Sequence, residues 1–225
     1  IDDKYKMPMK LTYFNVRGLA ETSRILLAIG GEEYEDFRYP LSVIDMSTHE
    51  MVKEEFDADK AAGKLVGSLN KVPFLEVDEI TIPQSKTIER FLARRFNMMG
   101  TTDLESAQID AICESVRDFK EMYQKVRSLS EEDKEAGTNE WFTVTLVERL
   151  SLLEHQMVGE TGFSVGSSIT LSDVVLYTYV TQFFDNKEAS YNATLATPKI
   201  RAIVDRVSSH AEVVSWLDRR PKTSF

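Results

Sequence analysis

The sequence predicts an α+β domain followed by an all-α domain, because two kinds of apolar periodicity divide it. The first hundred residues switch between period-two and helical spacing, whereas every strong apolar signal from residue 103 onward is helical. The chain has 225 residues, of which 42% are hydrophobic, so it can form two cores. We therefore expect domains at residues 7–97 and 103–225.

The first half begins with a strand, a helix and a second strand. Side chains alternate over Met9–Phe14, which predicts a strand, and helical spacing follows over residues 19–29. The pair Gly30-Gly31 is a typical helix stop. A second strand is expected at residues 34–39, which completes a βαβ unit.

Residues 46–64 are rich in helix formers, but Gly63 and Gly67 interrupt the pattern. We expect a helical excursion with irregular ends in this part of the chain. It is the least regular segment of the first half.

Two strands and a helix complete the first domain. A short apolar strand begins at Pro73, turns at residues 77–80 and continues as a second strand. A helix then opens at Gln84-Ser85, and its apolar residues fall on one side. These residues are Ile88, Phe91, Leu92 and Phe96. The result is βαβ followed by ββα, a small mixed sheet with helices.

The second half shows three apolar stripes at spacings of three and four, over residues 109–126, 146–157 and 200–207. We interpret these stripes as core. Thr170 and Asp173 have the spacing of a capping box, and flanking apolar residues suit a hydrophobic staple. This motif is interpreted as structural.

Charge and composition disfavour several classes of partner. The net charge is −10, from 27 basic and 37 acidic residues, which argues against nucleic acid or an anionic membrane. The three histidines are far apart and Cys113 is the sole cysteine, so a zinc site is not expected. Cys113 has apolar neighbours at helical spacing and is interpreted as a buried small residue.

No run approaches the roughly 18 apolar residues that span a bilayer, and the first residues lack the apolar stretch of a secretory signal. We expect a protein that is not secreted. The segment from Met7 has the character of a natural start, so the six residues before it are either an added tag or a native extension.

Four segments of the chain carry a family resemblance. They are KLTYFNVRGLAETSR, NKVPFLEVDEITIPQSKTIERFLA, SSITLSDVVLY and WLDRRPKTS. In this order and spacing the chain resembles cytosolic glutathione transferases, nearest to the sigma class that includes the glutathione-dependent prostaglandin D synthases. The resemblance covers most of residues 8–225.

The resemblance implies a thioredoxin-like domain that binds glutathione and an all-α helical-bundle domain that lines the electrophile pocket. It also implies a cytoplasmic, detoxifying homodimer. The expected partners are glutathione, as co-substrate, and small hydrophobic electrophiles, with no metal, nucleic acid or membrane. Fold alone does not establish activity, so the expected activity depends on individual site residues.

Tyr13 matches the family's catalytic tyrosine. A hydroxyl that donates a hydrogen bond to the glutathione sulfur favours thiolate, the nucleophilic form, over thiol. Without the resemblance, Tyr13 reads as a tyrosine packed at the end of a strand.

The other ligand-binding positions also come from the resemblance. Val72-Pro73 matches a cis-proline turn that pairs with the cysteinyl backbone. Ser85, at a helix N-terminus after Gln84, suits the γ-glutamyl carboxylate, although simple N-capping would use a serine equally well. Positions that match further glutathione contacts are Lys64, Asn70, Lys71 and, from the opposite subunit, Asp118. The implied walls of the electrophile pocket are Phe14, Gly18, Leu19 and Phe225.

The chain departs from the family pattern at several of these positions. Leu19 and Lys60 replace an arginine and a tryptophan that contact ligand, and segment 41–63 is longer. Arg117 and Lys125 replace a metal-linked acid and a pocket tryptophan of the prostaglandin D synthases. An arginine has no acceptor for a metal ion. Conjugation, or hydroperoxide reduction by the same thiolate, is therefore preferred, while prostaglandin isomerisation and a non-catalytic, crystallin-like role stay open as alternatives.

Overall fold

A computed structural model of the chain describes residues 8–45 and 50–223. Packing divides it into two compact units, which are described separately. One contains the chain up to Leu92 together with the segment from Ser215 onward, and the other is Ala93–Val214. The predicted α+β half followed by an all-α half is confirmed.

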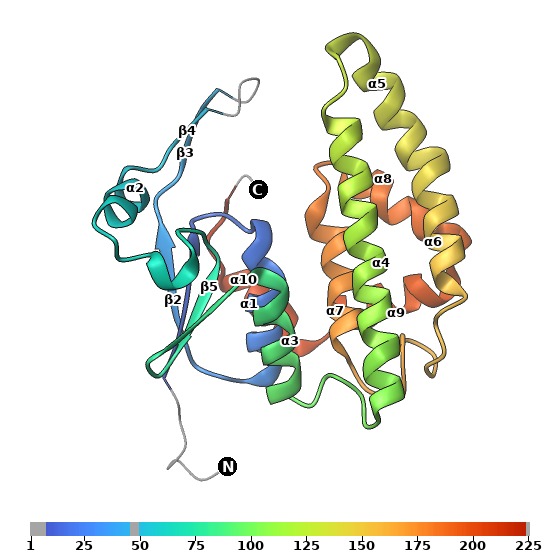
Figure 1. The fold of residues 1–225 in the computed structure, drawn as a ribbon. Coiled ribbons are helices and arrows are strands. Elements are labelled where there is room, and N and C mark those ends of the chain that lie inside the picture. Colours follow the sequence, from blue (N-terminus) through green and yellow to red (C-terminus); the bar gives the residue numbers. More distant parts are fainter. Residues whose placement is uncertain (1–7, 46–49, 224–225) are drawn as a thin grey trace. The chain divides into compact units, whose positions relative to one another are not determined.

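The first unit is built on a four-stranded sheet in the order β2-β1-β5-β6 (Figure 1). Its strands are β1 (Met9–Phe14), β2 (Glu35–Tyr39), β5 (Phe74–Val77) and β6 (Ile80–Pro83). Strand β1 runs parallel to β2 and antiparallel to β5, which pairs with β6 as a hairpin. A parallel pair needs a crossover, and helix α1 (Glu21–Gly30) supplies it.

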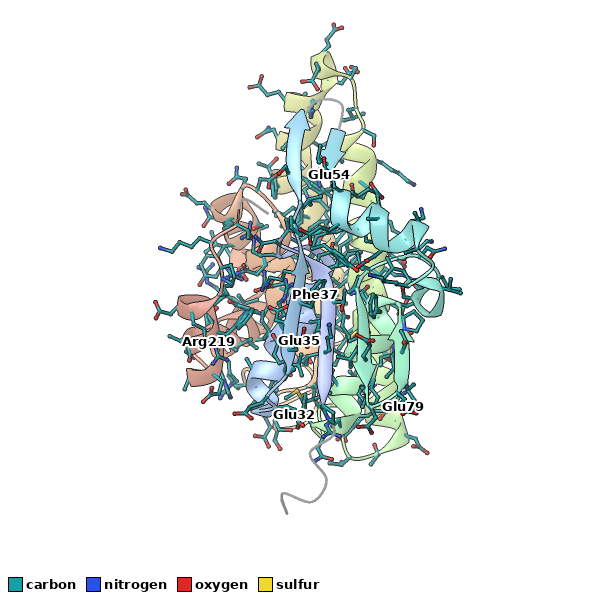
Figure 2. All side chains as sticks on the ribbon, turned by 90° about the vertical axis from the view of Figure 1, so that its left-hand side faces the viewer. Glu32, Glu35, Phe37, Glu54, Glu79 and Arg219 are labelled. Carbon is teal, nitrogen blue, oxygen red and sulfur yellow. The ribbon has the colours of Figure 1, made fainter. Side chains whose placement is uncertain are left out.

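Helices α1 and α3 (Ser85–Arg95) lie on one side of this sheet (Figure 1). Eight consecutive residues of α1 are buried, and the helix ends at Gly31 in the left-handed conformation. The opposite side of the sheet is turned to the viewer in Figure 2, where Glu35 and Phe37 of β2 are labelled. There the Lys10 ammonium pairs with Glu35 at 3.1 Å and lies 4.6 Å from the centre of the Phe37 ring.

The helical excursion expected at residues 46–64 is wrong in part. Strands β3 (Ser42–Asp45) and β4 (Glu50–Val52) form an antiparallel pair, and only α2 (Glu54–Ala61) is helical. Residues 46–49 lie outside the described part. Helix α2 buries Phe56 alone, so it has no apolar stripe that could extend it toward β4. A short 3-10 turn, η3 (Val66–Ser68), follows.

The second unit is a bundle of helices that follow the predicted stripes. Their bounds are α4 (Asp103–Arg127), α5 (Glu131–Glu140), α6 (Leu146–Glu154), α7 (Leu171–Thr178), α8 (Lys187–Asn192) and α9 (Pro198–Ser208). Two π-helical turns occur, η4 (Trp141–Thr145) and η5 (Tyr179–Phe183), and the 3-10 turn η6 (Ala193–Ala196) follows α8. The capping box of Thr170 and Asp173 is confirmed at the start of α7, and Cys113 is buried.

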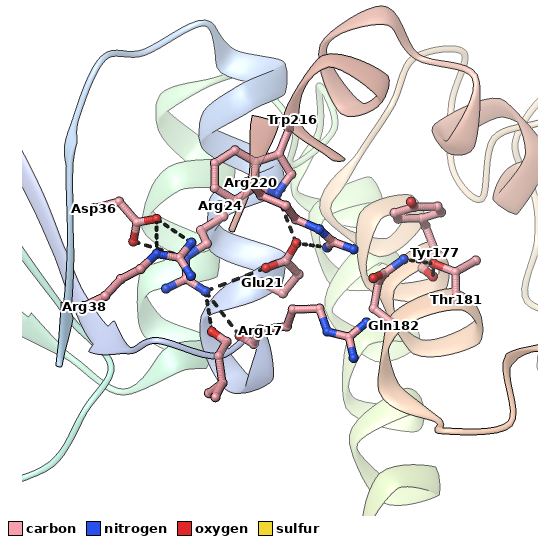
Figure 3. Close-up of polar contacts among 11 residues, drawn as sticks. Arg17, Glu21, Arg24, Asp36, Arg38, Tyr177, Thr181, Gln182, Trp216 and Arg220 are labelled. Atoms are coloured by element: carbon pink, nitrogen blue, oxygen red, sulfur yellow. Dashed lines mark hydrogen bonds and ion pairs between the residues drawn. The ribbon is translucent and has the colours of Figure 1, made fainter. Parts of the chain in front are cut away.

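Helix α10 (Ala211–Arg219) returns the chain to the first unit. Its Trp216 indole N–H donates to the Glu21 carboxylate at 3.0 Å, and the Arg220 guanidinium donates to the same oxygen (Figure 3). This contact explains why packing groups residues from Ser215 with the first unit, although the sequence prediction places them in the helical domain. The domain bounds 7–97 and 103–225 themselves stay a prediction.

We predict that Glu21→Ala destabilises the protein by about 3 kcal/mol, because it leaves buried basic partners without their carboxylate. Glu21 is 3% exposed. The measurement is the free energy of unfolding from urea titration at one protein concentration. Glu131→Ala is the control, since Glu131 pairs with Lys134 at 2.7 Å but is 88% exposed, and it should change stability by less than about 1 kcal/mol. Equal effects of the two changes would contradict the prediction.

Candidate functional site

The register of the sheet gathers three of the predicted segments at one end. Thr12 pairs with Phe74 across β1 and β5, and Phe74 pairs with Pro83 across β5 and β6. One residue beyond that row lie Tyr13, Pro73 and Gln84. The sequence-predicted tyrosine, proline turn and helix start are therefore neighbours in space, although up to 71 positions separate them in the chain.

Tyr13 is buried, with 8% of its surface exposed. Its hydroxyl oxygen accepts a hydrogen bond from the Leu19 backbone N–H at 3.2 Å. Burial raises the pKa of Tyr13, although the Leu19 N–H and the Arg24 charge lower it in part. The phenol consequently keeps its proton at neutral pH, and that proton is available for donation.

The segment before β5 offers free main-chain groups. The Val72-Pro73 peptide bond is cis, as the resemblance implied. Within the part of the chain that the structure describes, the Val72 N–H and C=O have no hydrogen-bond partner. Asn70 is left-handed at φ 55°, and its side-chain oxygen is buried with no partner among the described residues. Lys71 beside it is exposed.

The start of α3 is the second cluster of free donors. Gln84 has a φ of 72°, which is uncommon for a residue other than glycine, and its carbonyl accepts from the N–H groups of Thr87 and Ile88. The N–H groups of Ser85 and Lys86 and the Ser85 hydroxyl have no acceptor in residues 8–45 and 50–223. These groups can bind a carboxylate at the positive end of the helix dipole.

Other predicted residues lie in different surroundings. Lys64 pairs with Asp59 at 2.7 Å, and its ammonium lowers the pKa of that carboxyl. Phe14 packs against Tyr39 and Phe56, with ring centres 6.4 and 5.2 Å apart, as part of a core cluster. Asp118 is exposed on α4 in the second unit.

The remaining pocket positions are near the tyrosine or outside the structure. A Cβ atom on Gly18 would lie 2.9 Å from ring carbon Cε1 of Tyr13, so Gly18 is close to that ring. Leu19 follows with 56% of its surface exposed. Phe225 lies outside the described residues. The structure thus places Gly18 and Leu19 beside Tyr13.

Sequence reasoning missed Arg24, a buried residue that bonds to the segment between Tyr13 and α1. Its side chain is fully buried, and it donates to the Val16 carbonyl at 2.7 Å and to Asp36 at 3.2 Å (Figure 3). The guanidinium also lies 5.9 Å from the centre of the Tyr13 ring. A signal was present, because Glu21 and Arg24 stand three residues apart in the predicted helix, a spacing at which opposite charges can pair.

Comparison with known proteins assigns the fold and site to a family. Residues 9–94 match the family described as "Glutathione S-transferase, N-terminal domain", and residues 117–220 match "Glutathione S-transferase, C-terminal domain". The chain belongs to the glutathione S-transferase family. As a glutathione transferase it uses glutathione as co-substrate.

Sequence identity and structural similarity to individual relatives support this assignment. The chain is 34% identical over 218 residues to a hematopoietic prostaglandin D synthase of Gallus gallus, covering 96% of this chain and 98% of that protein. The sigma class transferase structure of Fasciola hepatica has 27% identity and a TM-score of 0.74, covering 98% and 100% of the two chains. The monomeric Na-GST-3 of Necator americanus has 28% identity and a TM-score of 0.76, covering 96% and 99%. The resemblance to the sigma class is thereby confirmed.

The described residues contain neither a membrane-spanning helix nor a group of side chains suited to a metal ion. In residues 8–45 and 50–223, no helix is long and apolar enough to cross a membrane. Across the same ranges, no group of three or more His, Cys, Asp or Glu side chains is placed to hold a metal ion.

Proposed function

We propose that this glutathione transferase conjugates glutathione to small hydrophobic electrophiles, with the Tyr13 hydroxyl stabilising the thiolate. The observation that carries the proposal is the buried phenol, whose oxygen accepts from Leu19 and whose proton stays free to donate. A donor aimed at a developing anion in a buried site favours the charged form. The same thiolate would also attack organic hydroperoxides.

Glutathione would lie along the end of the sheet described above. The free N–H and C=O of Val72 suit its cysteinyl backbone, and the free donors at Ser85 suit its γ-glutamyl carboxylate. Asn70 and Gln84 flank these groups, while Lys71 and Lys64 are the cations proposed for the glycyl carboxylate. Lys64 would have to exchange Asp59 for the ligand, which its 67% exposure permits.

The electrophile would lie beside the sulfur. We propose Gly18 and Leu19 as walls of its pocket because both lie beside Tyr13. The exposed Leu19 side chain supplies apolar surface. Phe14 is a weaker candidate because its ring is engaged in the core cluster. Phe225 is proposed as a pocket wall only because it matches a family position. The setting we propose is the cytoplasm, where such an enzyme would serve detoxification.

Prostaglandin isomerisation is the second candidate, favoured by the identity to a hematopoietic prostaglandin D synthase. Two residues count against it. Arg117, at the position of the metal-linked acid, pairs with Glu114 at 2.8 Å and has no acceptor for a cation. Lys125 places an ammonium where those enzymes have an aromatic ring. Together these residues favour conjugation, and we propose that no metal is needed.

We predict that Tyr13→Phe lowers kcat/KM for a chromogenic electrophile by about 10- to 100-fold, because the thiolate loses its donor. The acid limb of the pH profile should move to higher pH, since the bound thiol then ionises later. The affinity for glutathione, measured by calorimetry, should change little. An unchanged pH profile would remove Tyr13 from the mechanism, and retention on glutathione resin without turnover in the wild type would support a binding protein.

A second prediction concerns the helix start. Ser85→Ala should weaken glutathione binding by about tenfold, because it removes a hydrogen bond to a charged group. Thr87→Ala is the matched control, since Thr87 is an exposed residue in the same helical turn. Calorimetry of both variants is the measurement. Equal affinities in the two variants would restrict Ser85 to N-capping.

The third prediction tests the dimer. We propose that Asp118 reaches the γ-glutamyl amine of the opposite subunit, so each site needs two chains. Tyr13→Phe and Asp118→Asn homodimers should each be impaired. A heterodimer of the two variants, purified through two different tags, contains one intact site and should recover about half of the wild-type activity.

The heterodimer distinguishes the two arrangements, because no intact site would form if Asp118 acted within its own subunit. Glu121→Gln, an exposed acid on the same helix, is the control and should leave activity unchanged. A monomer in sedimentation, as the name of the Necator americanus protein describes for that relative, would also contradict this proposal.

A further inference from the structure

The segment between β1 and α1 includes the 3-10 turn η2 (Gly18–Ala20), and two of its residues approach Tyr13. The Leu19 N–H donates to the hydroxyl oxygen at 3.2 Å, and Gly18 has no room for a side chain beside the ring. A Cβ atom on Gly18 would be 2.6 Å from the hydroxyl oxygen and 2.9 Å from ring carbon Cε1. Real Cβ atoms do not approach other atoms so closely, so an alanine at this position must displace the phenol or the loop.

The contact with Leu19 fixes the direction in which the phenol can donate. A tyrosine hydroxyl has one proton and two lone pairs, and the Leu19 N–H occupies one lone pair. The proton is then turned away from Leu19. An N–H bond to the oxygen also withdraws electron density from it, which makes the O–H a stronger donor.

The loop itself is held from the protein interior. The fully buried Arg24 donates to the Val16 carbonyl at 2.7 Å, and its guanidinium is anchored by Asp36 and faces Glu21 (Figure 3). The loop therefore cannot yield easily when a side chain is added at Gly18. We therefore expect the phenol, at the end of a side chain, to move instead.

We propose that the Gly18-Leu19 peptide is the positioning element of the thiolate-stabilising tyrosine, with Gly18 required so that the Leu19 N–H can reach the phenol oxygen. This inference rests on the proposed role of Tyr13. It assigns to Gly18 a function in orientation, which differs from its predicted role as a wall of the electrophile pocket.

The test compares two alanine variants that share backbone strain but differ in contact. Gly18 has a φ of 41° and Gly31 a φ of 64°, so alanine is strained at both positions, but nothing lies within 4 Å of a Cβ on Gly31. Gly18→Ala should lower kcat/KM about tenfold and raise the pKa of bound glutathione by about one unit, read from the ultraviolet absorbance of the thiolate. Gly31→Ala should leave both unchanged.

The Tyr13→Phe background separates orientation from a general defect of the loop. If Gly18 acts through the hydroxyl, Gly18→Ala should add no further loss of activity there. Equal extra losses in both backgrounds, or a thiol pKa in Gly18→Ala like that of the wild type, would overturn the inference. If Tyr13→Phe itself leaves the thiol pKa unchanged, the proposed function fails first.

A measurement that needs no substitution at Gly18 covers the case in which Gly18→Ala does not fold. Hydrogen exchange of the Leu19 amide should be slow in the wild type and at least about tenfold faster in Tyr13→Phe, because its acceptor is gone. The Gly31 amide, which bonds to the Ala28 carbonyl, should exchange equally in both proteins. Equal exchange of the Leu19 amide in the two proteins would overturn the inference.

Discussion

The site depends on one buried cation, the guanidinium of Arg24. It is fully buried, and it binds carboxylates on α1 and β2 as well as the carbonyl of Val16 in the loop before α1. A guanidinium presents several donors in a fixed plane, so it can hold three elements at once. Because Glu21 also accepts from Trp216 and Arg220, the C-terminal segment is tied to the same centre.

The sheet register places the residues proposed to bind glutathione along one edge of the sheet. Tyr13, Pro73 and Gln84 each lie one residue beyond the same row of paired residues. An extended ligand can meet free main-chain groups at Val72 and free helix donors at Ser85 along that edge. Such groups cost stability unless water or a ligand satisfies them, which is typical of a binding site prepared before its ligand arrives.

Much of this could be predicted from the sequence, because strands, helices and the capping box depend on local spacing. The β3–β4 pair could not be predicted in this way. Each of these short strands depends on pairing with the other, and the helix formers around them indicate a helix instead. Arg24 was missed for a related reason. A charged residue on a helix is usually solvated, and only the tertiary positions of Asp36 and Val16 show that it is buried. The cis state of Val72-Pro73 came from the family resemblance and not from the residues.

The protonation of Tyr13 explains why a buried tyrosine suits the proposed thiolate stabilisation better than an exposed one. An exposed phenol would bind water, so its proton would be shared before a thiolate arrived. Burial raises the pKa of Tyr13 and removes the competing water, while Leu19 and Arg24 lower the pKa again by a smaller amount. The opposing effects leave a neutral phenol that is a stronger donor than burial alone would give. In the proposed mechanism donor strength matters only when the proton points at the sulfur, so the short segment proposed to set that direction would contribute to thiolate stabilisation together with the hydroxyl.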